Sequence, residues 1–179
     1  MTATTRSPAT SPRGISLGLT YGFLAAGGLA LTALAFGPTA AVDPRALLKP
    51  MLAMFALTVV VWLVLPMMRN WAVLTRRASA RYYQDFRSEP PPEWIERPAR
   101  TYDNLMQAPI LLYVISILMI VTAWADSVQV TLAWIFVALR AVHAAIYIGS
   151  NHLLARFASF ALSSLALWEI WLRYALHAL

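Results

Sequence analysis

Polar side chains recur at regular spacing inside an apolar stretch of the chain, TLAWIFVALRAVHAAIYIGSNH. They are Arg140, His143 and Tyr147, followed one turn later by Asn151. Spacings of three, four and four residues place these side chains on one narrow face of a helix. Arginine presents paired donors to a carboxylate, and an arginine or tyrosine donor can stabilise a thiolate or a developing anion. This face therefore predicts a binding site for an anionic ligand.

A second polar stripe lies in RPARTYDNLMQAP, residues 97–109, directly before the apolar run ILLYVISILMIVTAW. Its members are three or four residues apart and share a helix face: Arg100, Asp103, Asn104 and Gln107, with Arg97 at its edge. Asparagine and glutamine side chains pair with the amides of a peptide-like ligand. Because Arg156 begins the next apolar segment, we expect it to join both stripes around one pocket between helices.

Each of these residues also has a purely structural interpretation. Arg97 and Arg100 are of the type that anchors helices at a membrane surface. A charge at the middle of a membrane helix costs about 2.5–3.5 kcal/mol on insertion scales, so Arg140 needs a partner, and we expect Asp103 or another polar group of the third segment to supply it. His143 alone is typical of a packed core histidine, and Tyr147 alone of an interface aromatic. Two polar stripes at the same depth favour a site over these separate explanations.

The composition indicates that these stripes lie in an integral membrane protein. Of 179 residues, 60% are hydrophobic and 12% charged, and the mean hydropathy is +0.62, far from the balance of a soluble domain. A hydrocarbon core requires about 20 apolar residues as a helix. Five segments approach that length, so we expect an all-α bundle of membrane helices: 15–36, 47–68, 105–124, 128–148 and 153–176. Pro109 should bend the third near Leu105.

Charge and cysteine content exclude several functions. The chain has no cysteine, which excludes disulfides, thiolate metal ligands and cysteine catalysis, and we expect no metal site. The net charge is +6, yet half of the Lys and Arg residues lie between Arg69 and Arg100, without a docking module for nucleic acid. We therefore expect no nucleic-acid partner.

Glu169 and Arg173 are four residues apart in the last segment and predict a structural ion pair.

The termini and loops suggest an organisation within the membrane. Residues 1–14 are polar and predict a disordered tail, and residues 15–36 predict an additional membrane helix. A signal peptide is the alternative, but the apolar run exceeds the usual length of about 7–15 residues. Gly18 and Gly22, then Gly27 and Gly28, would permit close helix packing. The excess of Lys and Arg predicts that the N-terminus and loop 69–100 are cytoplasmic.

The two polar stripes resemble motifs of the MAPEG family, the membrane-associated proteins in eicosanoid and glutathione metabolism. ERPARTYDNLMQAP is similar to the family signature E-R-x-x-R-x-x-x-N-x-x-E, which continues to a proline. RAVHAAIYIGSNHLLARF is similar to the family segment R-x-x-H-x-x-x-Y, which is followed some residues later by an arginine. The resemblance extends over about residues 47–176, so residues 47–179 are expected to form a four-helix MAPEG-like domain behind the additional helix.

The resemblance implies a homotrimer with sites between neighbouring subunits near the cytoplasmic face, and glutathione as the ligand. It implies that Arg100 and Asn104 bind the glutathione peptide, that Arg140 and Tyr147 line the site, and that Arg156 stabilises the thiolate. Asp103, Gln107 and His143 fall on the same matched segments. Family activities are glutathione transfer to lipophilic electrophiles, peroxide reduction and isomerisation of lipid peroxides, so membrane lipid and a small lipophilic substrate are the expected partners.

Two residues depart from the family pattern and leave a second function open. Gln107 replaces the signature glutamate, and Asp103 replaces an arginine that often precedes the signature asparagine. The sequence is therefore compatible with a glutathione-dependent transferase or peroxidase, and also with a non-catalytic membrane protein that retains the fold. A small transporter is disfavoured because five helices without an inverted repeat are not typical of secondary transporters.

Overall fold

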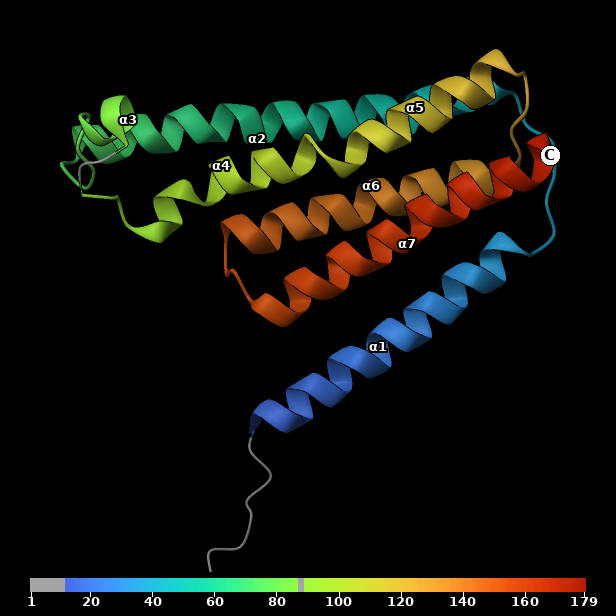
Figure 1. Cartoon of the computed structure of the whole chain (residues 1–179), viewed down its shortest axis with the longest axis horizontal. Coiled ribbons are helices and arrows are strands. Elements are labelled where there is room, and N and C mark those ends of the chain that lie inside the picture. The colour runs from blue at the N-terminus through green and yellow to red at the C-terminus, as the bar shows by residue number, and fades with distance from the viewer. Residues whose placement is uncertain (1–11, 87–88) are drawn as a thin grey trace, which may run out of the picture.

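The computed structural model describes residues 12–86 and 89–179, and this part of the chain is a helical bundle (Figure 1). The elements are α1 (Pro12–Ala35), η1 (Pro44–Leu47), α2 (Leu48–Leu74), α3 (Tyr82–Asp85), α4 (Glu93–Leu105), α5 (Ala108–Val121), α6 (Ser127–Ile148) and α7 (Leu153–Ala178). Within the described ranges the only β pairing is an isolated bridge between Ala41 and Asp126. The predicted all-α fold is confirmed.

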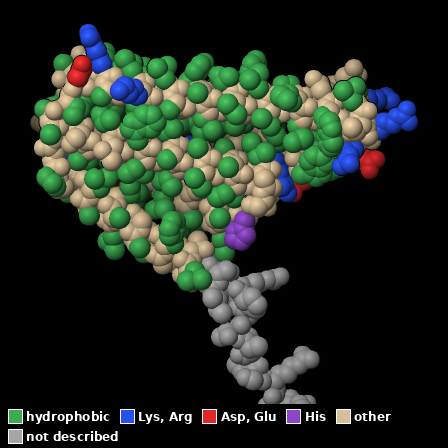
Figure 2. Space-filling view, turned by 180° about the vertical axis from the view of Figure 1, so that it is seen from behind, with side chains coloured by type: hydrophobic (Ala, Val, Ile, Leu, Met, Phe, Trp, Pro, Cys, Tyr) green, Lys and Arg blue, Asp and Glu red, His purple; other side chains and the backbone are tan. Residues whose placement is uncertain are grey.

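Five stretches are long and apolar enough to cross a membrane: Leu17–Ala35, Pro44–Leu74, Glu93–Val121, Ser127–Ile148 and Leu153–Ala178. Figure 2 shows the corresponding belt of hydrophobic side chains, with Lys and Arg side chains gathered toward the two ends of the molecule. An apolar belt of this kind is stable only where lipid rather than water surrounds it. The five predicted segments are therefore all present as helices.

The boundaries differ from the sequence prediction in two places. The third segment begins at Glu93 rather than near residue 105, because Pro92 stands at the helix N-cap and Glu93 and Glu96 occupy its first turn. Acidic side chains there interact favourably with the helix dipole. The second segment continues to Leu74, so the connection spans residues 75–92 and contains the short helix α3.

The predicted bend near Leu105 is confirmed. Helix α4 ends at Leu105, and α5 starts at Ala108 with Pro109 in its first turn. Proline is tolerated there because the first helical N–H groups have no intrahelical partner. The predicted tail 1–14 can be compared only in part, since residues 1–11 lie outside the described residues and helix α1 already begins at Pro12.

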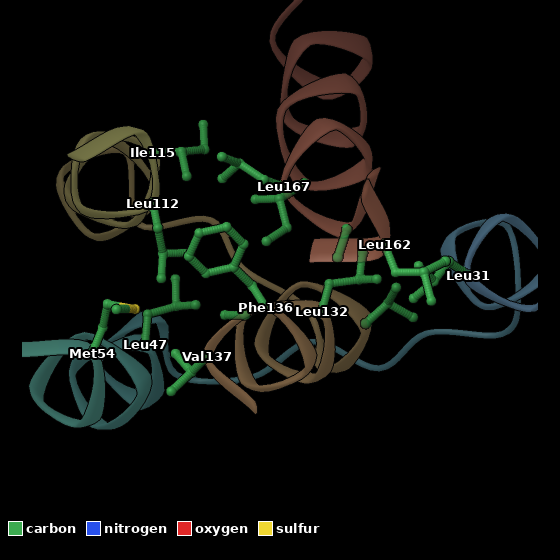
Figure 3. Close-up of a cluster of buried hydrophobic side chains, with 14 of the residues drawn as sticks. Leu31, Leu47, Met54, Leu112, Ile115, Leu132, Phe136, Val137, Leu162 and Leu167 are labelled. Atoms are coloured by element: carbon green, nitrogen blue, oxygen red, sulfur yellow. The ribbon is translucent and has the colours of Figure 1, made fainter. Parts of the chain in front are cut away.

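The helices surround one hydrophobic core. Helices α6 and α7 are antiparallel neighbours, α4 lies beside α2, and α1 lies along α7 (Figure 1). Figure 3 shows core side chains from α2, α5, α6 and α7, with Leu31 of α1 at the edge. The tight turn after Ile148 places α6 and α7 side by side, as the sequence predicts.

The additional helix α1 packs closely at Gly27 and Gly28, not at Gly18 and Gly22. A Cβ on Gly27 would lie 2.9 Å from Cδ2 of Leu162, whereas no described atom lies within 4 Å of such a position on Gly18 or Gly22. A side chain at position 27 would therefore require the side chain of Leu162 to shift.

Polar contacts join α1, α6 and α7 at the end of the bundle where the chain terminates. Asp126 caps α6 by accepting a hydrogen bond from the backbone N–H of Gln129, and it forms an ion pair with Arg173. Arg173 also donates to the carbonyl of Ala35. The predicted Glu169–Arg173 pair is thus wrong, because Asp126 holds the guanidinium and Glu169 instead accepts from Thr32 at 3.1 Å.

At the opposite end, polar contacts of Glu96 join α2, α3 and α4. Arg69 contacts Glu96 at 2.7 Å, and the hydroxyl of Tyr83 donates to the other carboxylate oxygen at 3.0 Å. Burial, and then the hydrogen bond to Glu96, raise the pKa of Tyr83 from 10.0 to about 12. The folded protein therefore favours the neutral phenol more strongly than the unfolded chain does.

The hydrogen bond between Tyr83 and Glu96 should weaken only at very alkaline pH. Because the folded pKa is the higher one, the contribution of Tyr83 is complete below pH 10 and is lost as the pH rises through about 12. In a tyrosinate absorbance titration we expect Tyr83→Phe to remove an ionisation near pH 12. Tyr82→Phe is the matched control, since it keeps the ring that contacts Tyr83 edge to face. A titration curve near pH 12 that Tyr83→Phe leaves unchanged would contradict this assignment.

Candidate functional site

Arg140 is a fully buried cation at the centre of the bundle. Its Nη1 donates to Oδ1 of Asn104 at 2.7 Å, which ties α6 to the last turn of α4. Its guanidinium lies over the rings of Phe160, at 4.8 Å, and Phe136, at 5.2 Å. Its Nε and Nη2 have no hydrogen-bond partner within the described ranges. The arrangement leaves positive charge that protein groups neutralise only in part.

The expected ion pair between Arg140 and Asp103 is absent, and Asp103 is exposed. Consecutive residues of a helix point about 100° apart, so only one of Asp103 and Asn104 can face α6. Asn104 takes that position. The prediction that a polar group of this helix serves Arg140 is therefore confirmed, and of the two candidates the structure selects Asn104 rather than Asp103.

The rest of the α4 stripe does not converge on Arg140. Arg100 and Gln107 are exposed, like Asp103. Gln107 stands between α4 and α5 with φ −105° and ψ −88°, outside helical geometry. The helical spacing that predicted a continuous stripe therefore ends at Leu105. Among the four stripe residues, Asn104 alone reaches the interior of this protomer.

The stripe on α6 does converge with Arg156. The Arg156 guanidinium lies 4.2 Å from the ring centroid of Tyr147, and its Nη1 donates to Oδ1 of Asn151 at 2.5 Å. His143 Nδ1 is 3.0 Å from the carbonyl oxygen of Arg156. A carbonyl can only accept, so this contact requires a proton on Nδ1. His143 thus links α6 to α7.

Asn151 connects this group to α4 through a contact that the sequence did not reveal. It lies in the α6–α7 turn at φ 51°, a backbone conformation that asparagine adopts more readily than most residues. Its Nδ2 donates to Glu93 at 3.1 Å, while Arg97 donates to the carbonyl of Gly149 at 2.8 Å. The start of α4 and the α6–α7 turn therefore hold Arg156 jointly.

These residues border a hollow of about 250 Å³ between α4, α6 and α7. Its lining is Asn104, His143, Tyr147, Leu153, Arg156, Phe157 and Phe160. The sequence analysis did not identify Leu153, Phe157 and Phe160. Leu153 and Phe160 are three and four residues from Arg156 and share its face of α7, whereas Phe157 directly follows Arg156 and no such spacing indicates it. The lining contains one guanidinium and no carboxylate, with Arg140 immediately behind Asn104 and Phe160. Such a hollow suits an anionic group with an apolar portion. The described residues contain no cluster of metal-ligating side chains.

Removing the Asn104 side-chain amide should destabilise the protein, because it leaves the buried Arg140 without its hydrogen bond. A hydrogen bond to a charged group contributes about 1.5–3 kcal/mol, and we expect Asn104→Leu to lower the free energy of unfolding in mixed micelles by that amount. Asp103→Asn is the neighbouring control and should change it by less than about 0.5 kcal/mol. Equal losses in both variants would restore Asp103 as the partner of Arg140.

The family comparison agrees with this architecture. No curated protein sequence and no solved structure shows significant similarity to the chain. The family model described as MAPEG family matches residues 52–176, which is more than half of the chain and includes α4, α6, α7 and every residue of the hollow. With its five apolar helices, the chain is an integral, multi-pass membrane protein. It belongs to the MAPEG family of membrane-associated proteins in eicosanoid and glutathione metabolism.

Proposed function

We propose that the protein binds glutathione and joins it through its sulfur to lipophilic electrophiles dissolved in the membrane, or uses it to reduce hydroperoxides there. The supporting observation is the half-buried guanidinium of Arg156, which lines the hollow beside Tyr147 and Asn104 with no carboxylate in the lining. A glutathione thiol is mostly protonated at neutral pH, and a fixed cation nearby favours the thiolate. Arg156 is therefore assigned as the residue that activates the thiol.

In the transfer reaction, the thiolate sulfur attacks an electrophilic carbon of the lipid-phase substrate and forms a carbon–sulfur bond. The electron pair of the broken bond leaves with the displaced group, or protonation completes an addition to a conjugated double bond. Tyr147 can donate its phenolic proton to the developing anion. Phe157 and Phe160 line the same hollow and provide apolar surface for the lipophilic substrate.

Arg140 contributes by charge. Its guanidinium is enclosed with two donor groups unpartnered, and burial reduces screening by water. A positive potential at the base of the hollow attracts the carboxylates of glutathione. Asn104 fixes the orientation of Arg140 and presents its own amide N–H groups to the peptide. His143 lines the hollow and supports Arg156 through its backbone.

We further propose that the exposed residues of α4 act across a subunit boundary. Arg100, Asp103 and Gln107 point away from the hollow of their own protomer. In a homotrimer of the kind found in the family they would face a neighbouring copy, where Arg100 and Gln107 would contact glutathione. The loop between α2 and α4 would then lie on the cytoplasmic side of a bacterial inner membrane, together with the hollow.

A non-catalytic membrane protein with the same fold is the second candidate. It is favoured by Gln107, which lacks the carboxylate of the family signature, and by Asn151, which already accepts a hydrogen bond from Arg156. In that case the helices would be linked structurally through Arg156, Asn151 and Glu93. The hollow would then bind no thiol ligand.

Glutathione binding to the purified protein distinguishes the two candidates. By calorimetry in detergent we expect binding in the micromolar-to-millimolar range, driven by the charges around the hollow and therefore weakened by salt. The comparison variant is Asp103→Arg with Gln107→Glu, which restores the family residues and should bind more tightly. If only this variant binds, the site is retuned for another ligand. If neither binds, the non-catalytic candidate replaces the proposal.

Arg156→Ala tests the activation of the thiol. Removing one donor that stabilises a developing anion lowers rates by roughly 10²–10³-fold, and we expect a loss of that order in conjugation of a lipophilic electrophile. Arg45→Ala removes an equal charge in an exposed connection at the opposite end of the bundle and should leave the rate unchanged. An active, correctly assembled Arg156→Ala protein would refute the catalytic assignment.

A further inference from the structure

A second polar hollow, of about 680 Å³, lies between the end of α2 and the start of α4, outside the site described above. Its lining comprises Val73, Arg76, Arg77, Ala78, Ser79, Ala80, Glu89, Pro90, Pro91 and Pro92. We propose that this hollow binds the headgroup phosphate of an anionic phospholipid in the adjacent leaflet. The proposal is independent of glutathione and concerns the way in which the loop is held against the membrane.

The length of α2 places the hollow at the depth of the lipid phosphates. At a rise of about 1.5 Å per residue, the 27 residues of α2 extend about 40 Å, whereas the hydrocarbon core is about 30 Å thick. The last turns of α2, from about Arg69 to Leu74, therefore stand in the headgroup layer. Arg76 and Arg77 follow directly. In Figure 2, Lys and Arg side chains gather at this end beyond the apolar belt.

The end of α2 positions both arginines by backbone hydrogen bonds. The N–H of Arg77 bonds to the carbonyl of Ala72 at 2.8 Å, and the N–H of Arg76 bonds to that of Val73 at 3.0 Å. This pair of bonds is the Schellman arrangement, which requires the left-handed conformation that Arg76 adopts at φ 56°. Consecutive guanidinium groups are thus fixed at a helix end rather than carried on an open loop.

Two tryptophans further restrict Arg77. Its guanidinium lies 5.0 Å from the ring centroid of Trp71 and 5.9 Å from that of Trp94, and the two rings are 5.7 Å apart. Tryptophan is enriched at the membrane interface, which supports the depth assigned above. A guanidinium that lies over aromatic faces still presents its N–H edge to a phosphate.

The charges around the hollow leave these two arginines available. Arg69 is paired with Glu96 at 2.7 Å and Arg81 with Asp85 at 3.6 Å, whereas Arg76 and Arg77 have no carboxylate partner within the described residues. Glu89 is the one carboxylate in the lining, so two guanidinium groups outnumber it and a phosphodiester would still be attracted. The occupant is a lipid rather than a soluble anion because Leu74, which follows the lining residue Val73, leaves 83% of its surface exposed at the membrane interface.

The test measures which lipids stay bound to the protein. The protein is embedded in nanodiscs of phosphatidylcholine mixed with phosphatidylglycerol and then released into detergent, and native mass spectrometry identifies the lipids that it retains. We expect retention of phosphatidylglycerol over phosphatidylcholine. An arginine near the surface contributes about 1 kcal/mol, or about fivefold in affinity, so the preference should fall about 25-fold in Arg76→Gln/Arg77→Gln. Arg45→Gln/Lys49→Gln removes the same charge at the opposite end of α2 and should retain the preference.

Three results would overturn the proposal. The first is equal retention of the two lipids by the unchanged protein, and the second is an equal loss of the phosphatidylglycerol preference in the two double variants. The third is displacement of phosphatidylglycerol by millimolar glycerol phosphate, which would indicate a site for soluble phosphate. If loss of the Arg77 ring contacts unfolds the double variant, the single variant Arg76→Gln provides the test of the proposal. No ring or carboxylate contact of Arg76 is present in the described part of the chain, and its substitution should reduce retention about fivefold. Unchanged retention in that variant would refute the assignment.

Discussion

A guanidinium enclosed in the middle of an apolar bundle constrains everything around it. A buried charge is costly unless hydrogen bonds or aromatic faces compensate it. Arg140 obtains one hydrogen bond from α4 and two aromatic faces from α6 and α7, so these three helices must meet at its depth. The hollow forms where they do so. Because compensation by protein groups is incomplete, the same constraint gives the hollow its positive character.

The two ends of the bundle are held in different ways, and the difference bears on function. At one end the ion pair between Asp126 and Arg173 is largely buried and also joins α1 to the bundle. At the other end the contacts of Glu93, Arg97 and Asn151 are more exposed. Exposed polar contacts contribute little to stability. The end that contains the hollow can therefore adjust around a ligand at lower cost than the end that contains the buried pair.

The two departures from the family signature lie on the outer surface of the protomer. Asp103 and Gln107 are both exposed, and neither lines the hollow. The carboxylate of Asp103 therefore does not lie among the groups that line the hollow, and it does not oppose an anion bound there. Any part that these two residues play in binding therefore depends on what covers the exposed face of α4.

The sequence by itself determined the membrane class, the five helices, the bend before Pro109 and the family, because hydropathy, proline and motif spacing act over short distances along the chain. It also identified Arg140, Tyr147, Asn104 and Arg156 as residues that belong together. Tertiary structure decided which partner each one has. Asn104 rather than Asp103 reaches Arg140, and Asp126 rather than Glu169 reaches Arg173. Adjacent residues on a helix differ by about 100° in direction, and only the rotation of each helix against its neighbours, set by core packing, selects the one that points inward.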